Sequence, residues 1–140
     1  MKAFFYIIIW FLIFNCKAFS EEITFNCTFK NWVEHKMMGE VYKSKYDLSP
    51  EITTDKQIIF KKNNDTEIFV TDTSFIYPPI KEKIKVSIKK DELIFTYGEL
   101  ESLFEVFILN RISGDLIKDV KRFDEKVTIY YKCEKTDKLI

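Results

Sequence analysis

Two segments near the ends of the chain alternate apolar and polar residues, and each carries a cysteine on its apolar side. The first is ITFNCTFK (23–30), with Cys27, and the second is VTIYYKC (127–133), with Cys133. A period of two residues is that of a half-buried β-strand. The sequence therefore predicts a strand at each end of one domain, with both cysteines turned toward the core.

The two cysteines are predicted to form a disulfide. An even pair in an oxidising compartment is typical of a disulfide, and closing a loop of about a hundred residues contributes up to ~4.7 kcal/mol. A metal site needs three or four ligands, whereas the chain after residue 20 offers Cys27, Cys133 and the single histidine, His35. We therefore predict the bridge Cys27–Cys133, with no metal site and no cofactor.

The first twenty residues have the layout of a secretory signal peptide. Lys2 precedes twelve apolar residues (3–14), and Ala18-Phe19-Ser20 places small residues where a signal peptidase cuts. Twelve helical residues span about 18 Å, well short of a hydrocarbon core roughly 30 Å thick. We predict cleavage after Ser20 and a secreted or periplasmic location. The alternative is an uncleaved signal anchor, which would keep the domain on the membrane.

Cys16 raises the question of a lipid anchor of the bacterial lipoprotein type. That motif has Leu three residues before the cysteine and a small residue directly before it, and here those positions hold Ile13 and Asn15. The mismatch disfavours lipidation of Cys16, which is predicted to be removed with the signal peptide.

The remaining residues, 21–140, have the size of a single domain with its own core. Removing Lys2 and Lys17 lowers the 22 basic residues to 20, against 22 acidic ones, which leaves a net charge of about −2. This balance gives no attraction for nucleic acid. Apolar residues make up 46% of the chain, which excludes a disordered tail.

Several further strand candidates lie between the two end segments, joined by turn residues such as Asn63-Asn64-Asp65 and Ser113-Gly114. The stretch 102–110 fits a helix or a strand, and its aromatic and β-branched residues favour a strand. Its apolar face would be Phe104, Val106 and Ile108. We expect seven or eight strands in an all-β antiparallel barrel or sandwich, with one helical turn at 98–102 or 117–123.

Candidate catalytic groups are sparse. His35 could act as an acid or base beside nearby glutamates, although a lone histidine among charged residues is usually a solvated surface residue. Glu99, Glu101 and Glu105 could supply the two carboxylates of a glycosidase. Carboxylates are common on solvated faces, so the sequence alone assigns no catalytic residue.

Two other patterns have ordinary structural explanations. Four lysines, at positions 81, 83, 85 and 89, lie along one strand candidate and could bind phosphates, but an edge strand also uses lysines to prevent aggregation, and we favour the edge interpretation. Asn26 and Asn64 match the N-glycosylation motif, which arises often by chance and is used only in a eukaryotic secretory pathway.

The C-terminal part, FEVFILNRISGDL followed by VTIYYKCEK, resembles a pattern in small secreted proteins of unknown function from bacteria with AT-rich genomes. The matching residues are Asn110, Arg111, Ser113, Gly114 and Cys133. The resemblance covers about thirty residues. It implies a periplasmic β-domain and no particular activity.

These features favour a non-enzymatic domain with a binding or structural role. One version is a lipocalin-like barrel holding a small apolar ligand, because an eight-stranded barrel can enclose one. The phenylalanines would then line a cavity, whereas the simpler interpretation is that they fill the core. A hydrolase using His35 or paired glutamates and a protein-interaction module are the alternatives.

Overall fold

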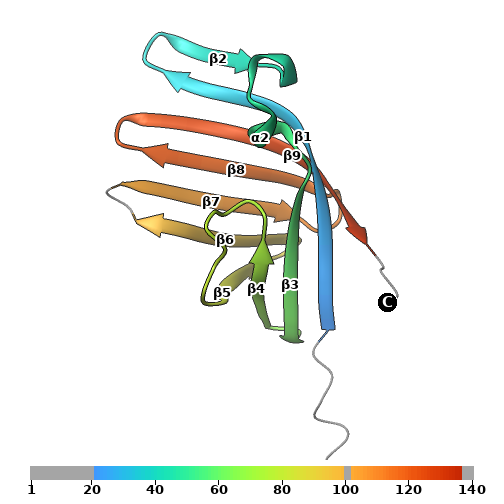
Figure 1. Ribbon diagram of the computed structural model, residues 1–140. Coiled ribbons are helices and arrows are strands. Elements are labelled where there is room, and N and C mark those ends of the chain that lie inside the picture. The colour runs from blue at the N-terminus through green and yellow to red at the C-terminus, as the bar shows by residue number, and fades with distance from the viewer. Residues whose placement is uncertain (1–20, 100–101, 137–140) are drawn as a thin grey trace, which may run out of the picture.

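The computed structural model describes residues 21–99 and 102–136, which form nine strands and two single helical turns (Figure 1). The predicted signal peptide, Cys16 and Glu101 lie outside these residues. The elements are β1 Glu21–Lys36, β2 Gly39–Lys43, η1 Lys45–Asp47, α2 Pro50–Thr53, β3 Lys56–Asn64, β4 Glu67–Thr73, β5 Ile84–Lys89, β6 Glu92–Glu99, β7 Leu103–Asn110, β8 Asp115–Arg122 and β9 Glu125–Thr136.

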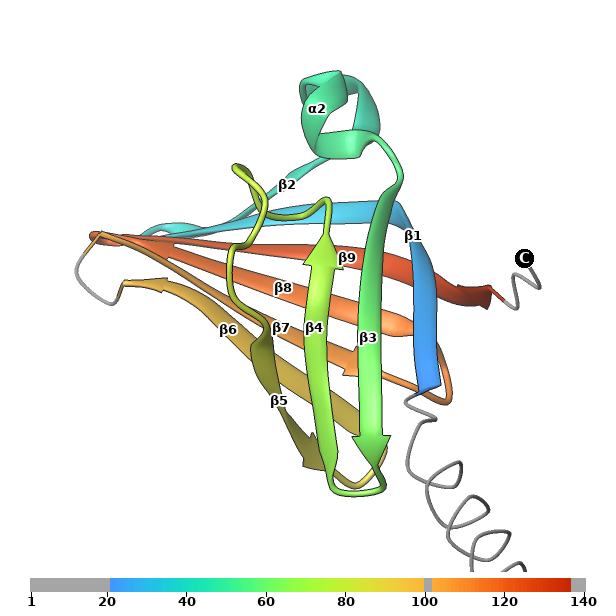
Figure 2. The same cartoon turned by 60° about the horizontal axis from the view of Figure 1, so that its bottom comes forward.

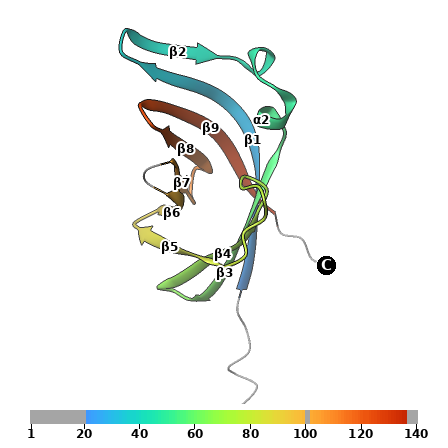
Figure 3. The same ribbon diagram turned by 60° about the vertical axis from the view of Figure 1, so that its left-hand side comes forward.

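Eight of the strands close into an antiparallel barrel. The order is β1-β3-β4-β5-β6-β7-β8-β9, and pairing of β9 with β1 completes the ring. Figure 3 shows the curved wall that these strands form around the interior. The prediction of an all-β antiparallel architecture is confirmed, and of its two versions the chain adopts the barrel.

The ninth strand, β2, extends the sheet beyond the barrel because β1 is long and bent. The first part of β1 pairs with β3 and its last part pairs with β2, while β9 runs along both. A β-bulge between Phe29 and Asn31 shifts the register at the bend. In Figure 1 the β1–β2 hairpin therefore lies beyond β9, at the top of the sheet.

The centre of the barrel is filled by aromatic side chains. Phe95 and Phe107 stack with ring centroids 4.5 Å apart, and edge-to-face contacts extend this pair in both directions. The rings form a continuous series from one end of the interior to the other: Phe25, Phe60, Phe95, Phe107, Phe75, Tyr131 and Phe29. An eight-stranded barrel is just wide enough for side chains to fill. The phenylalanines thus form the core, as the simpler interpretation predicts.

Cys27 and Cys133 form the predicted disulfide. They are direct partners in the β1–β9 ladder and are buried. Next to the bridge, the turn between β7 and β8 is fixed by Asn110, whose side-chain oxygen accepts hydrogen bonds from the backbone N–H groups of Ile112 and Ser113. Gly114 ends this turn at φ +80°, and its carbonyl accepts the N–H of Cys133 at 2.7 Å.

Three details of the sequence-based prediction are wrong. Neither of the two segments expected to form a helical turn is helical where it is described: Gly98 and Glu99 end β6, and residues 117–122 belong to β8. In β8 the alternation of Leu116, Lys118 and Val120 toward the interior suits a strand. The lysine-bearing strand β5 is not an edge, since it pairs with both β4 and β6. In β7 the inward side chains are those of the odd-numbered residues, including Glu105, and not Phe104, Val106 and Ile108.

Candidate functional site

Two recesses open at opposite ends of the barrel, separated by the aromatic core. The wide recess, about 480 Å³, lies at the end where β3 begins and β4 finishes. The narrow recess, about 170 Å³, lies at the end where β1 begins and β9 finishes. The wide recess is the candidate functional site because ligand pockets usually measure roughly 300–1,000 Å³.

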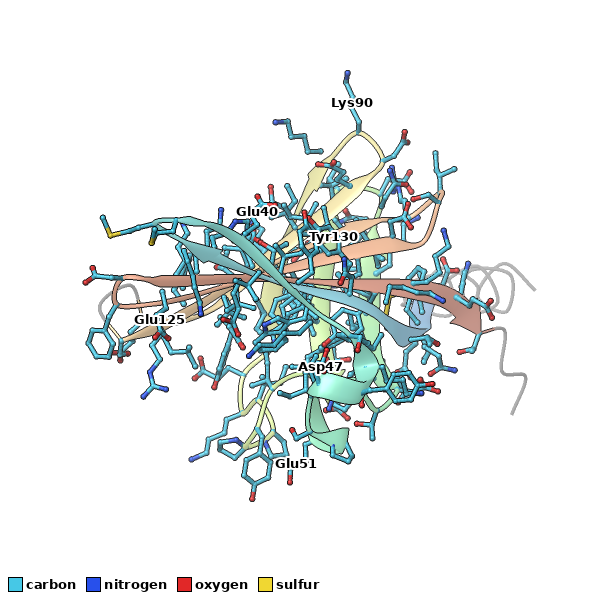
Figure 4. The ribbon with its side chains drawn as sticks, turned by 90° about the horizontal axis from the view of Figure 1, so that it is seen from above. Glu40, Asp47, Glu51, Lys90, Glu125 and Tyr130 are labelled. Carbon is cyan, nitrogen blue, oxygen red and sulfur yellow. A yellow bond between two sulfur atoms is a disulfide. The ribbon has the colours of Figure 1, made fainter. Side chains whose placement is uncertain are left out.

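The walls of the wide recess come from the barrel and from two connecting segments. Helix α2 contributes Glu51 and Ile52, and the loop after β4 contributes Ser74, Phe75 and Tyr77. Figure 2 shows both segments at the same end of β3 and β4, and Figure 4 shows Glu51 on the helical segment. The strands supply the remaining lining residues: Trp32, Lys56, Leu103, Glu105, Lys118, Val120, Ile129 and Tyr131.

An ion pair lies deep in this recess. Lys118 Nζ is 3.1 Å from Glu105 Oε1, and these side chains are only 11% and 12% exposed. The two residues occupy diagonal positions on the inner face of neighbouring strands β7 and β8. The same ammonium lies 5.5 Å from the centroid of the Phe107 ring and 5.7 Å from that of Phe75. Lys118 therefore has a carboxylate partner and aromatic neighbours and is largely buried.

Tyr131 forms part of the floor beside this pair. Burial raises the pKa of its phenol well above the usual range, and the negative charge of Glu105 acts in the same direction. The phenol is therefore neutral at physiological pH and keeps its proton as a hydrogen-bond donor. Its ring packs edge-on against Phe75 at 4.9 Å.

At the rim, the indole of Trp32 is positioned by the ion pair between Glu34 and Lys43. Its indole Nε1 donates to Glu34 Oε1 at 3.2 Å, and the same oxygen accepts from Lys43 Nζ at 2.7 Å. The hydrogen bond from Lys43 lowers the pKa of Glu34 below its usual value. Because Trp32 has a fixed partner on its polar edge, its ring faces are left to contact the recess.

The charges that line the wide recess balance one another. Glu105 faces Lys118, and Lys56 Nζ donates to the backbone carbonyl of Glu51 at 2.8 Å. The recess thus combines an apolar, aromatic wall with two positive and two negative groups. Such a site suits a compact molecule with an apolar body and no net charge.

His35, the candidate acid–base residue, lies on the outer face of the barrel and lines neither recess. Its Nε2 is 2.8 Å from Thr128 Oγ1, and that hydroxyl donates to Asp119 Oδ1 at 2.7 Å. Because the single hydroxyl proton goes to Asp119, His35 must donate to Thr128 and does not draw a proton from it. Its Nδ1 lies 3.6 Å from Glu40, which Figure 4 labels near Tyr130.

The two candidate carboxylates among the described residues have different surroundings. Glu105 lies in the wide recess with Lys118, Glu99 is exposed at the end of β6, and Glu101 lies outside the described residues. The glycosylation candidates are both exposed: Asn26 accepts a hydrogen bond from Gln57, and Asn64 accepts two from Thr66 at the β3–β4 turn.

Sequence reasoning did not predict Lys118, Tyr131 and Trp32 as site residues. The alternation of inward and outward residues along a strand could have indicated one of them. Lys118 falls between Leu116 and Val120 on the inward side of β8, where a charged residue calls for a partner. Tyr131 was expected to face inward, but the sequence does not show that it lies where the core ends and the recess begins.

Comparisons of the chain with protein-family models, with curated proteins and with solved structures returned no match. In the described ranges, none of the helical segments has the length and apolar character to cross a bilayer. Within the same residues, no cluster of three or more His, Cys, Asp or Glu side chains is arranged to hold a metal ion. The Cys27–Cys133 bridge indicates maturation in an oxidising, extracytoplasmic compartment.

Proposed function

We propose that this chain is a secreted or periplasmic, non-enzymatic binding domain whose wide recess holds a small, uncharged or zwitterionic molecule with an apolar body. The observation that supports this most directly is the lining. Aromatic and aliphatic side chains surround the buried Lys118–Glu105 pair and the neutral Tyr131 phenol. A few convergent polar groups in an apolar recess are typical of ligand sites.

The ion pair limits the chemistry of the ligand. An anionic group would have to compete with Glu105 for Lys118, and a cationic group would have to compete with Lys118 for Glu105. A neutral amide, hydroxyl or carbonyl can instead hydrogen-bond to a remaining N–H group of Lys118 or to a carboxylate oxygen of Glu105 without separating the two side chains. The ligand's apolar body would lie between Trp32 and the wall formed by Leu103 and Val120.

The hydrolase alternative gains no support from the geometry. His35 is outside both recesses, and Glu105 is engaged by Lys118 at 3.1 Å. A general acid and a general base must both reach the substrate, and the wide recess does not bring these two candidates together.

Binding can be tested with the neutral apolar dye N-phenyl-1-naphthylamine. The chain has two tryptophans, so Trp10→Phe in the full chain leaves Trp32 as the only donor for energy transfer to the dye. We expect saturable binding of one dye molecule, with quenching of Trp32 emission because Trp32 lines the recess. Native mass spectrometry of protein isolated from its own host then reports the retained natural ligand.

A matched pair of variants on β8 locates the binding site. Val120→Phe fills the wide recess, whereas Ile117→Phe adds a similar ring on the outer face of the same strand. We expect Val120→Phe to weaken dye binding at least ~10-fold, which is about 1.4 kcal/mol, and Ile117→Phe to leave it unchanged. Equal dye affinity in the two variants would show that the wide recess is not the binding site.

A protein-interaction role has one observation in its favour. The β1–β2 hairpin exposes Met37, Met38, Val41 and Tyr42, and β2 has β1 as its sole strand neighbour among the described residues. An extended segment of a partner could add to this edge. A photo-crosslinking amino acid at Tyr42 should then give one discrete product that Val41→Asp abolishes. A product that survives Val41→Asp would argue against partner addition here.

A further inference from the structure

The narrow recess has an apolar floor and a basic rim, unlike the wide recess. The floor is formed by Ile23, Phe25, Phe60, Ile68 and Leu93. The rim is formed by Lys62, Arg111 and Lys135.

Two of the basic residues share one structural position. Each lies two residues beyond a buried inward residue of its strand: Lys62 follows Phe60 and Lys135 follows Cys133. Because side chains alternate along a strand, both continue the inner face of the barrel past its apolar part. Arg111 reaches the rim from the turn that follows β7. The ladder agrees, since Lys135 is the partner of Phe25 and Lys62 is the partner of Ile68.

Two exposed acidic residues, Glu21 and Asp65, lie near this rim. Lys62 pairs with Asp65 at 3.2 Å, but Asp65 is 97% exposed and such a surface pair is weak. Arg111 Nη2 donates to the backbone carbonyl of Lys90 at 2.8 Å, and Glu21 faces Lys62 across the β1–β3 ladder. None of the described residues that line the recess is acidic. The rim therefore keeps donors for an anion.

We propose that the narrow recess is a second binding site, for a small amphiphile that places an anionic head group, such as a carboxylate, among Lys62, Arg111 and Lys135. The volume of the recess limits the size of the ligand's apolar group. A cavity of about 150 Å³ lined by Leu, Ile and Phe accepts benzene, and this recess measures about 170 Å³. One six-membered ring or a short chain fits, and the head group forms charge-assisted hydrogen bonds at the rim.

This site is independent of the proposed function. It lies at the other end of the barrel, shares no residue with the wide recess, and selects for negative charge rather than neutrality. The head-group chemistry alone is also compatible with anionic lipids of a bilayer surface. The apolar floor behind the rim favours a free molecule, because a lipid head group would leave that floor uncovered.

Benzoate is the probe for the test, with benzyl alcohol as its uncharged counterpart of similar size. Both are titrated into the ¹⁵N-labelled full chain while amide resonances are followed by NMR. We expect saturable benzoate shifts at residues 23–25 and 60–62 and at Lys135, and binding of benzyl alcohol at least ~10-fold weaker. Added salt should weaken benzoate binding, because the rim contacts are charged.

Variants that remove positive charge test which lysines bind the anionic head group. Lys62→Gln with Lys135→Gln should weaken benzoate binding at least ~5-fold, while Arg111 is kept because it also ties the turn to Lys90. The control, Lys30→Gln with Lys61→Gln, removes the same charge from outward positions and should change binding less than ~2-fold. Amide spectra of the unliganded variants verify that both fold.

The outcomes that overturn the proposal are definite. Equal affinity for benzyl alcohol, shifts confined to other regions, or equal losses in the two double variants would each remove the anion site. Binding to vesicles of phosphatidylglycerol and phosphatidylcholine, absent with phosphatidylcholine alone and accompanied by no benzoate binding, would assign the rim to a membrane surface instead.

Discussion

Removing the Cys27–Cys133 bridge should cost this domain a large share of its stability. The cysteines are 106 residues apart, and a crosslink closing a loop of that length restricts the unfolded chain by about 4.7 kcal/mol at 25 °C. Replacing both buried cysteines by alanine also removes two sulfur atoms from the core, roughly one methylene equivalent each, at about 0.8 kcal/mol apiece. We expect Cys27→Ala with Cys133→Ala to lower the free energy of unfolding by about 6 kcal/mol.

Urea unfolding of the oxidised protein and of the double variant, followed by circular dichroism, measures this difference. The unlinked unfolded chain exposes more surface, so the slope of the free energy against urea should also rise in the variant. Folded domains typically have only 5–15 kcal/mol of stability, and the variant should therefore be close to unfolding at 37 °C. A loss below about 1.5 kcal/mol with an unchanged slope would refute the reasoning, because the β1–β9 ladder alone would then hold the chain ends.

Three further predictions concern single sites. Glu105→Gln leaves the Lys118 ammonium buried without an anion and should cost about 3–5 kcal/mol in urea unfolding, whereas Glu105→Leu with Lys118→Met should stay near the wild type. Gly114→Ala requires a side chain at φ +80° against the Cys133 carbonyl and should cost about 1–3 kcal/mol, measured as a fall in thermal midpoint. The raised pKa of Tyr131 favours folding below the phenol's ordinary pKa of about 10, and this contribution is lost as pH rises above it; absorbance at 295 nm should show Tyr131 ionising only as the domain unfolds, a step that Tyr131→Phe removes.

The alternation in the first and last strands was enough to predict their inner faces. Phe25, Cys27, Tyr131 and Cys133 are apolar or weakly polar, and their neighbours in sequence are polar. With the cysteines on those faces, the bridge between the two strands was predictable, but the sequence left open whether the strands pair directly or face each other. The choice between barrel and sandwich was not predictable, because closure depends on pairing between strands and leaves no mark within any one of them.

The candidate site was harder to predict because β7 is apolar on both faces. Phe104, Val106 and Ile108 cover its outside, while Phe107 and Leu109 face the core. Because neither face of β7 is polar, alternation does not show whether Glu105 points inward or outward. Parity on β8 indicates that Lys118 needs a partner, but the sequence does not identify Glu105 as that partner. The recesses themselves depend on where the aromatic core ends, which is a property of packing and not of local sequence.

The position of the bridge also determines how the domain responds to mechanical tension. A force pulling the beginning of β1 away from the end of β9 can extend the six residue-to-residue steps from Glu21 to Cys27 and the three from Cys133 to Thr136. Those nine steps yield roughly 30 Å at full extension. Beyond that, the covalent S–S bond transmits the pull, and the chain between residues 28 and 132 lies outside the covalent path of the force. In single-molecule stretching the oxidised domain should therefore behave as a short inextensible link, and only chemical reduction would let it unravel.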